Sequence, residues 1–429
     1  MTILLPTITF NGDITINSRD VNFISAPPET DESLLGNRRA LILRAGGDIT
    51  ITGDTVTSND NGWGGPIILA AGGNISTASL DSRTIGTTPG RGGDITLNAG
   101  GDITLTNEIQ SSSQTSKSGD ITLISEQGAI NANGVTLDAS NSGFGESGTI
   151  TLQAQNDIRI NNLWSRGKTA TEDHPGTITV ISQAGAIDAS GGLIDTDTGS
   201  GSANANEGDV TIRAWGDIVT GEIQAGGEFG GGDISLTSTT GGIDTRAGRL
   251  SAFSDNGDSG SITLTAENDI ITATIESAVG QTVMGNPVNG NSGNITLTSN
   301  TGSIDTSGGM LESRTNNGNA GSITLTAEND ITTEAIVSFL YEDATGNSGD
   351  ISVTSTDGSI TTLGTLDNRI TLGNGGSITL KAENDITTVD AISTTGGTFS
   401  LTGRGAIALQ APIDTDGGTI TITGNTIDA

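Results

Sequence analysis

Carboxylates are the side chains of this 429-residue sequence with the most evident chemical potential. The chain has 50 Asp and Glu residues against 17 Lys and Arg, which gives a formal net charge of −33. Two carboxylates facing one groove could serve as the acid and base of a polysaccharide lyase or hydrolase. So many carboxylates also form pairs by chance, and the few scattered Lys and Arg residues disfavour a lyase base. We therefore expect no enzyme, with a polysaccharide-active enzyme as the alternative.

The single histidine, His174, lies in the segment TATEDHPG. It has no Ser or Cys partner in a recognisable motif, and the sequence contains no nucleophile elbow, phosphate loop or zinc-ligand spacing. The sequence also contains no Cys, so neither disulfides nor thiolate metal sites are expected. We interpret His174 as an ordinary loop residue with respect to catalysis.

A second group of carboxylates recurs in Gly-Asp pairs, at Asp94, Asp120, Asp209, Asp233 and Asp350. Repeated carboxylate and carbonyl oxygens are ligands that Ca²⁺ prefers. Other repeats carry a neutral polar residue at the same position: Thr149, Thr177, Ser261, Asn294, Ser322 and Ser377. Because all of these side chains can hydrogen-bond to turn backbone, we predict a capping role, no cofactor and no metal site, with Ca²⁺ as the alternative.

The charge balance narrows the range of partners. No basic patch is present that could neutralise nucleic-acid phosphates, and anionic membranes would repel the chain. No apolar run approaches the roughly 18 residues of a membrane helix, so no membrane insertion is expected. The start, MTILLPTITFNGD, lacks the basic and apolar regions of a signal peptide. Either the protein stays inside the cell or the sequence is a segment of a larger secreted chain, and we expect the second.

An internal repeat predicts the elements that position these side chains. The motif Gly-x-Ile-[Thr/Ser]-Leu and its close variants begin at Gly93, Gly119, Gly148, Gly176, Gly208, Gly232, Gly260, Gly293, Gly321, Gly349 and Gly376. From Gly93 to Gly376 there are 283 residues in ten intervals, a mean of 28.3. Such a period is typical of a solenoid, and it is too short for a propeller blade of about 40–50 residues.

Each repeat predicts three short strands. In GSITLTAENDITT (Gly321–Thr333), Ile323 and Leu325 alternate with Thr324 and Thr326, which places apolar and hydroxyl side chains on opposite faces. Further strands are centred on Ile331 and Ile336. We predict an all-β, right-handed three-sided parallel β-helix with about 28 residues per turn. Residues 1–45 would form atypical turns or a partial cap, 46–396 regular turns, and 397–429 shorter turns.

Two types of repeat alternate along the chain. One type has Asp directly before the Ile of the second strand, as in Asp269-Ile270 and Asp330-Ile331, and the other has a small residue there, as in Ser303-Ile304. Carboxylates in one column would lie about 4.8 Å apart in successive turns, which is unfavourable for like charges. We hypothesise that the alternation staggers them.

The loop after the third strand, called here the third corner, varies most in length and chemistry. Such loops carry Trp164 and His174, and Phe339 and Tyr341. Insertions in solenoids collect on one face, which is often the binding face. These four residues are therefore candidate binding residues, and the alternative for Trp164 and Phe339 is that they cover an edge of the hydrophobic core.

Three phrases of the repeat resemble a known family: GGDITLNAGGDITLT (from Gly92), GSITLTAENDITT (from Gly321) and GGSITLKAENDITT (from Gly375). They resemble the repeat regions of filamentous-haemagglutinin-like exoproteins, large bacterial adhesins exported by two-partner secretion, and are similar to the cyanobacterial members. The resemblance covers roughly residues 45–425 and implies a right-handed β-helix, an outer-membrane transporter as secretion partner, and an extended surface fibre. The family's secretion domain, with its Asn-Pro-Asn-Gly-type motif, is not evident, so such export would concern a longer parent chain.

Together these observations predict an extracellular or cell-surface adhesin or structural rod. Its variable third corners would bind other cells, cell-surface glycans or matrix. The alternatives are a purely structural spacer and a filament that self-associates end to end.

Overall fold

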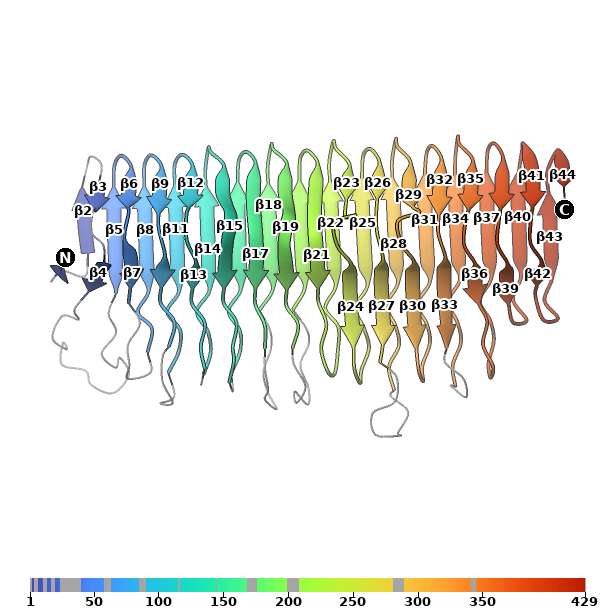
Figure 1. The fold of residues 1–429 in the computed structure, drawn as a ribbon, viewed down its shortest axis with the longest axis horizontal. Coiled ribbons are helices and arrows are strands. Elements are labelled where there is room, and N and C mark those ends of the chain that lie inside the picture. Colours follow the sequence, from blue (N-terminus) through green and yellow to red (C-terminus); the bar gives the residue numbers. More distant parts are fainter. Residues whose placement is uncertain are drawn as a thin grey trace. The chain divides into compact units, whose positions relative to one another are not determined.

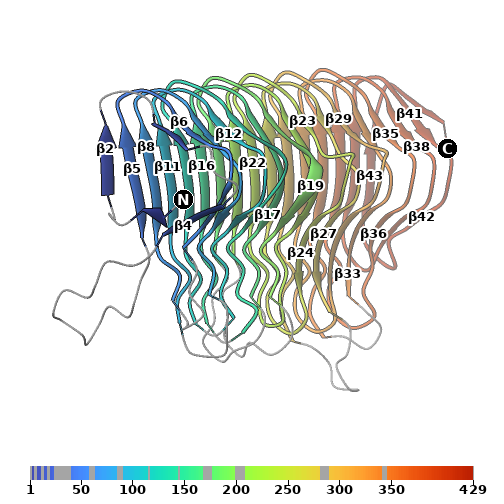
Figure 2. The same ribbon diagram turned by 60° about the vertical axis from the view of Figure 1, so that its left-hand side comes forward.

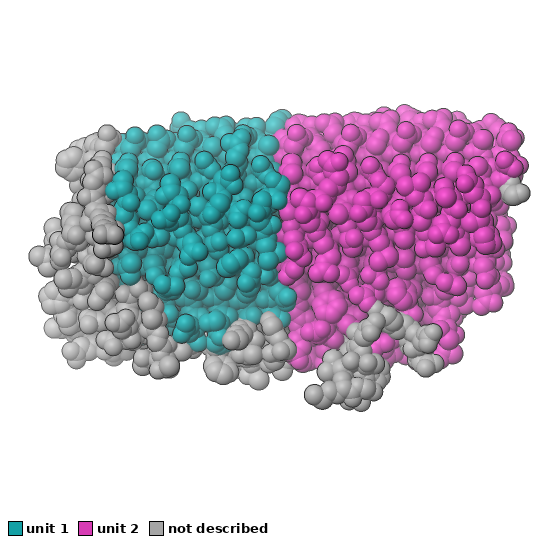
Figure 3. Space-filling model, viewed as in Figure 1, with its two compact units in different colours: residues 1–215 teal, residues 216–429 magenta. Residues whose placement is uncertain are grey.

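The chain forms two compact units, residues 1–215 and residues 216–429 (Figure 3). The computed structural model describes residues 40–57, 63–84, 90–114, 116–143, 145–167, 176–198, 208–280, 289–340 and 345–428, and the backbone of β1 (Thr2–Ile3), β2 (Thr7–Phe10), β3 (Ile14–Ile16) and β4 (Asp20–Phe23). All regular structure in these residues is β, and none of their segments is a helix long and apolar enough to cross a membrane.

Each turn of the chain contributes a first, a second and a third strand. In one turn of unit 2 these are β31 (Ile323–Ala327), β32 (Ile331–Thr333) and β33 (Ile336–Leu340). Each strand pairs in parallel with its counterpart in the next turn, as Ile323 does with Ile351 and Ile331 with Ile360. Within each unit the turns therefore stack into a β-solenoid (Figures 1 and 2).

The strands of unit 1 fall into the same three groups. Its first strands are β5 (Leu41–Ala45), β8 (Ile67–Ala71), β11 (Ile95–Ala99), β14 (Ile121–Ser125), β16 (Ile150–Ala154), β18 (Ile178–Ser182) and β20 (Val210–Ala214). The second strands are β6 (Ile49–Ile51), β9 (Ile75–Thr77) and β12 (Ile103–Leu105), and the third strands are β7 (Asp54–Val56), β10 (Leu80–Asp81) and β13 (Ile109–Gln110). Second and third strands merge in β15 (Ile130–Asp138), β17 (Ile158–Trp164) and β19 (Ile187–Asp195).

The strands near the N-terminus follow the same pattern. β2, β3 and β4 pair in parallel with β5, β6 and β7. Residues 24–39, in the segment predicted to be atypical, lie outside the described part of the chain.

Unit 2 begins with a merged strand, β21 (Ile218–Gln224). Its further first strands are β22 (Ile234–Ser238), β25 (Ile262–Ala266), β28 (Ile295–Ser299), β34 (Ile351–Ser355), β37 (Ile378–Ala382), β40 (Phe399–Gly403) and β43 (Ile420–Thr423). The second strands are β23 (Ile243–Asp244), β26 (Ile270–Ile271), β29 (Ile304–Thr306), β35 (Ile360–Thr362), β38 (Ile386–Thr388), β41 (Ala406–Leu409) and β44 (Thr426–Asp428). The third strands are β24 (Leu250–Ser254), β27 (Ile275–Val279), β30 (Leu311–Thr315), β36 (Leu366–Asn368), β39 (Ile392–Thr394) and β42 (Ile413–Asp414).

Columns of Ile and Leu fill the interior of each unit. Ile323, Leu325, Ile331 and Ile336 of one turn are all fully buried. Burial of each such side chain stabilises the fold by about 1.5–3 kcal/mol, so a core with few aromatic residues suffices. The predicted fold class, an all-β parallel β-helix with three-strand turns of two alternating types, is confirmed.

The first corner, between the first and second strands, shows what the Asp-bearing turns do. The carboxylate of Asp330 accepts a hydrogen bond from the backbone N–H of Ser359 in the following turn, at 2.8 Å. The neighbouring Asn329 donates its side-chain N–H to the carbonyl oxygen of Thr301 in the preceding turn, also at 2.8 Å. Adjacent side chains of one turn thus bind the turns on both sides.

The same carboxylate contact recurs in both units, at 2.6–3.0 Å. It joins Asp48 to Asn74, Asp102 to Ala129, Asp157 to Ala186, Asp217 to Gly242, Asp269 to Ser303 and Asp385 to Ala406. These Asp residues lie in alternate turns, so the predicted staggering is confirmed. Two turns separate the carboxylates by about 9.6 Å, close to the distance over which physiological salt screens exposed charges.

Most of the intervening turns carry Ser and Gly at this corner. Ser355 donates its hydroxyl to the carbonyl oxygen of Asn329 at 2.6 Å and accepts the N–H of Gly358 at 2.9 Å. A Cβ on Gly358 would lie 2.4 Å from the backbone carbon of Asn329, and one on Gly185 would lie 2.5 Å from the carboxylate of Asp157. The turn that follows an Asp-bearing turn therefore carries a Gly where a Cβ would collide with the Asp-bearing turn.

Candidate functional site

The third corner is the most variable part of the turn. Three residues separate Ala327 from Ile331 at a first corner, and four separate Ser355 from Ile360. At third corners, by contrast, 15 residues separate Val279 from Ile295, whereas four separate Thr394 from Phe399. Variation in chain length is thus concentrated at the third corner. Trp164 and Phe339, which the sequence placed in its loops, lie instead in the strands that precede it, because their side chains continue the alternation of those strands.

Trp164 lies at the end of β17 in unit 1 and is half-buried. The guanidinium of Arg166 lies over its ring, 4.1 Å from the ring centroid, and pairs with the buried carboxylate of Asp195 at 2.5 Å. Asp195 is also the register partner of Trp164 on the next turn. One face of the indole is therefore occupied by Arg166, which leaves less of the ring for a ligand.

Two of the other candidates, His174 and Tyr341, lie outside the described residues. Phe339 lies in β33 of unit 2 and is half-buried. Arg314 is its register partner on the preceding turn.

A ladder of ion pairs covers the outer face of the third strands before Phe339. Glu276 accepts from Arg249 at 3.0 Å and from Arg314 at 2.6 Å, and Arg314 also pairs with Glu312 at 3.0 Å. Glu276 and Glu312 are direct register partners, and their side chains are only 9% and 13% exposed. Burial raises the pKa of Glu312, and the charge of Glu276 raises it further, while Arg314 lowers it. Since both oxygens of Glu276 are bound to arginines, the ladder is better suited to holding strands together than to acid–base catalysis.

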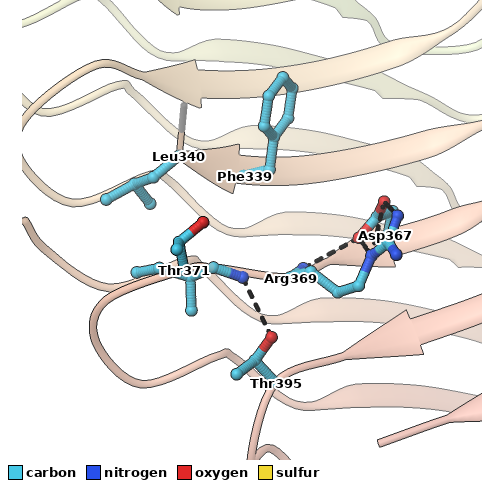
Figure 4. A pocket seen from close by; sticks show the side chains of 7 residues that line it. Phe339, Leu340, Asp367, Arg369, Thr371 and Thr395 are labelled. Atoms are coloured by element: carbon cyan, nitrogen blue, oxygen red, sulfur yellow. Dashed lines mark hydrogen bonds and ion pairs between the residues drawn. The ribbon is translucent and has the colours of Figure 1, made fainter. Parts of the chain in front are cut away.

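An open depression of about 490 Å³ follows Phe339 at the third corner (Figure 4). Three successive turns contribute its lining residues: Phe339, Leu340, Asp367, Arg369, Ile370, Thr371 and Thr395. Leu340 and Ile370 are buried and pack with Ala320 in one apolar cluster, which forms the floor. In Figure 4 the ring of Phe339 lies higher in the view than the Asp367–Arg369 pair and to the left of it.

Asp367 and Arg369 form a two-point ion pair beside this floor. Nε of Arg369 lies 3.1 Å from Oδ1 of Asp367, and Nη2 lies 2.8 Å from Oδ2. The backbone N–H of Arg369 also donates to Oδ1, at 2.9 Å. Hydrogen bonding to Asp367 is the main cause that raises the pKa of Arg369 above its usual value, so the guanidinium stays charged. The pair is a rigid, solvent-facing set of donors and acceptors.

The Gly-Asp carboxylates hydrogen-bond to backbone groups of the following turn. Asp94 accepts the N–H of Asp120 at 3.1 Å, and Asp120 accepts that of Thr149 at 2.9 Å. Two further contacts, each 2.7 Å, join Asp233 to Ser261 and Asp350 to Ser377. Asp209 accepts the N–H of Ile178 through its backbone carbonyl. The carboxylate contacts are the predicted capping bonds, and within the described ranges no three His, Cys, Asp or Glu side chains gather as a metal site would require.

A smaller depression of about 240 Å³ lies on the second-strand face of unit 2, above Gly242. Its carboxylates are engaged: Asp217 with the N–H of Gly242, Asp269 with that of Ser303, and Asp244 with Arg246. None of its eight lining residues is aromatic, so we regard the larger depression, which Phe339 lines, as the better candidate site.

Sequence reasoning identified Phe339 but missed Asp367, Arg369, Glu276 and Glu312. A signal for the first two is present in the spacing. Asp-x-Arg recurs at the ends of strands, as in Asp244-x-Arg246, and side chains two apart on a strand share a face.

Comparisons with known proteins identify no relative. The chain matches no protein-family model, no curated protein and no solved structure.

Proposed function

We propose that this chain is a segment of a bacterial cell-surface or secreted fibre of the filamentous-haemagglutinin-like type. It would reach the surface through the outer-membrane transporter of a longer parent chain. Its third corners would bind other cells, glycans or matrix, and it would have no enzyme activity and no cofactor.

The proposal rests on the contrast between the first and the third corner of each turn. The first corners are nearly constant because Asp330 and its counterparts bind the backbone of the next turn. The third corners vary in length, and one of them holds the depression beside Phe339. A scaffold of repeated turns with variable loops on one side is a common way to present a binding surface.

Attachment of protein-coated beads tests the proposal. Beads that carry the full chain should attach to bacterial cells, or to surfaces coated with polysaccharide or matrix protein, more strongly than uncoated beads. A structural spacer would show no attachment to any of these surfaces.

A further inference from the structure

We infer that the depression beside Phe339 binds a neutral saccharide, with one sugar ring against Phe339 and neighbouring hydroxyl groups on Asp367 and Arg369. This inference deepens the proposed adhesive function and rests on it. It names the class of ligand and the residues that recognise it.

The apolar part of the depression fits the face of a sugar ring. Leu340 and Ile370 are only 4% and 6% exposed, so the floor is fixed by the core beneath it. Phe339 is half-buried and presents its ring at the edge of this floor. The C–H bonds on one face of a pyranose are attracted to the electron-rich face of an aromatic ring. Floor and ring together provide an apolar platform in an otherwise polar surface.

The polar part fits a pair of neighbouring hydroxyl groups. A guanidinium has five N–H donors, and the ion pair with Asp367 occupies one on Nε and one on Nη2. The remaining donors of Arg369 and the remaining lone pairs of Asp367 lie side by side. One hydroxyl can donate to the carboxylate while its neighbour accepts from the guanidinium. The exposed residue Thr371 adds a further hydroxyl at the rim.

Charge selects a neutral ligand over an acidic one. Asp367 already neutralises Arg369, and the nearby charge of Asp414 also acts on that guanidinium. The chain as a whole carries a net charge of −33. A uronic acid, a sulfated sugar or a phosphate would meet this field without an unpaired cation to bind it.

The fold disfavours a peptide as the ligand. Extended peptides commonly bind by adding a strand to an open sheet edge. The strands beside the depression have no open edge, because β33 pairs with β30 and β36, and β36 pairs with β33 and β39. The backbone groups that a peptide would need are already paired.

A printed array of neutral and acidic oligosaccharides, probed with the full chain, tests the class of ligand. Titration calorimetry with the best neutral oligosaccharide then compares the wild type with Phe339→Ala and Arg369→Lys. The matched control is Arg246→Lys, because Arg246 forms the same two-point pair with Asp244, at 3.0 Å and 2.6 Å, outside the depression. Thermal unfolding of each variant checks that it is folded.

We expect neutral oligosaccharides to bind, with affinity lowered at least tenfold by Phe339→Ala and by Arg369→Lys and unchanged by Arg246→Lys. Arg369 is exposed, so its Lys variant should fold even if Phe339→Ala does not. Binding of acidic oligosaccharides alone, an absence of any binding, or equal affinity in the wild type and Arg369→Lys would overturn the inference. Attachment of wild-type beads that persists in both variants would leave the adhesive function standing and overturn the saccharide site. If the chain binds saccharide but its beads attach to no surface, the saccharide site would stand and the adhesive function would be overturned.

Discussion

Asp330 and Ser359, which lie 29 positions apart in the sequence, are joined by a hydrogen bond of 2.8 Å from the backbone N–H of Ser359 to the carboxylate of Asp330. This contact links one turn of unit 2 to the next. Its counterparts recur in alternate turns of both units. The acidic residues at the first corner are therefore part of the scaffold.

Asp330→Ala should expose the N–H of Ser359 and cost about 0.5–1.5 kcal/mol of local stability, the usual net worth of one hydrogen bond. Amide hydrogen exchange at Ser359 should accelerate accordingly. Asp330→Asn keeps an acceptor oxygen and should leave this rate close to that of the wild type. Equal exchange in the wild type and in Asp330→Ala would show that the contact is not formed.

Gly358→Ala should destabilise unit 2 by about 1–3 kcal/mol, the usual cost of overpacking, since its Cβ would meet the backbone of Asn329 at 2.4 Å. Urea unfolding measures this loss. Ser359→Ala, at the next position, keeps its backbone N–H and should change stability little. A Gly358→Ala variant as stable as the wild type would contradict the coupling between Asp-bearing and Gly-bearing turns.

Arg314→Ala should leave Glu276 and Glu312 stacked without the cation between them. Removing one partner of a largely buried ion pair is costly, so we expect a loss of up to about 3 kcal/mol in urea unfolding. Arg246→Ala breaks an exposed pair that solvent screens, so its effect should be much smaller. Similar losses for the two variants would mean that the ladder contributes no more than a surface ion pair.

Glu312 should make the stability of unit 2 depend on pH. Its pKa is raised in the folded state, chiefly by burial, so the folded state holds this proton more tightly than the unfolded state does. The resulting stability is fully present below the unfolded pKa of about 4.5 and is lost as pH rises through the raised folded pKa. Glu312→Gln should therefore gain stability over the wild type at pH 7, and the gain should vanish near pH 4. Urea unfolding at both pH values checks the sign, and a gain that is the same at both would contradict it.

The alternation of Ile323 and Leu325 with Thr324 and Thr326 was sufficient to predict the strands, because burial of one face repeats every two residues. The period of about 28 residues was sufficient to predict that these strands stack. The roles of Asn329 and Asp330 could not be predicted, since they depend on which backbone groups of the neighbouring turns lie within reach.

The depression beside Phe339 could not be predicted from the sequence, for a similar reason. Phe339 and Arg369 are 30 positions apart, and they meet only because β33 and β36 stack in register. The variable length of the third corner hides that register in the sequence. The pairing of Asp367 with Arg369, two positions apart at the end of β36, could have been predicted from the sequence.

The most direct test of the central claim, that the third corner carries recognition, is the attachment of beads coated with the full chain. Phe339→Ala changes the end of a third strand, beside the third corner. Leu363→Ala and Val389→Ala, combined in one control variant, change exposed apolar residues between second and third strands of the same unit. We expect attachment to cells or to polysaccharide-coated surfaces to fall severalfold with Phe339→Ala and to stay unchanged in the double control variant. Equal attachment by all three proteins, or a larger loss in the control, would contradict it.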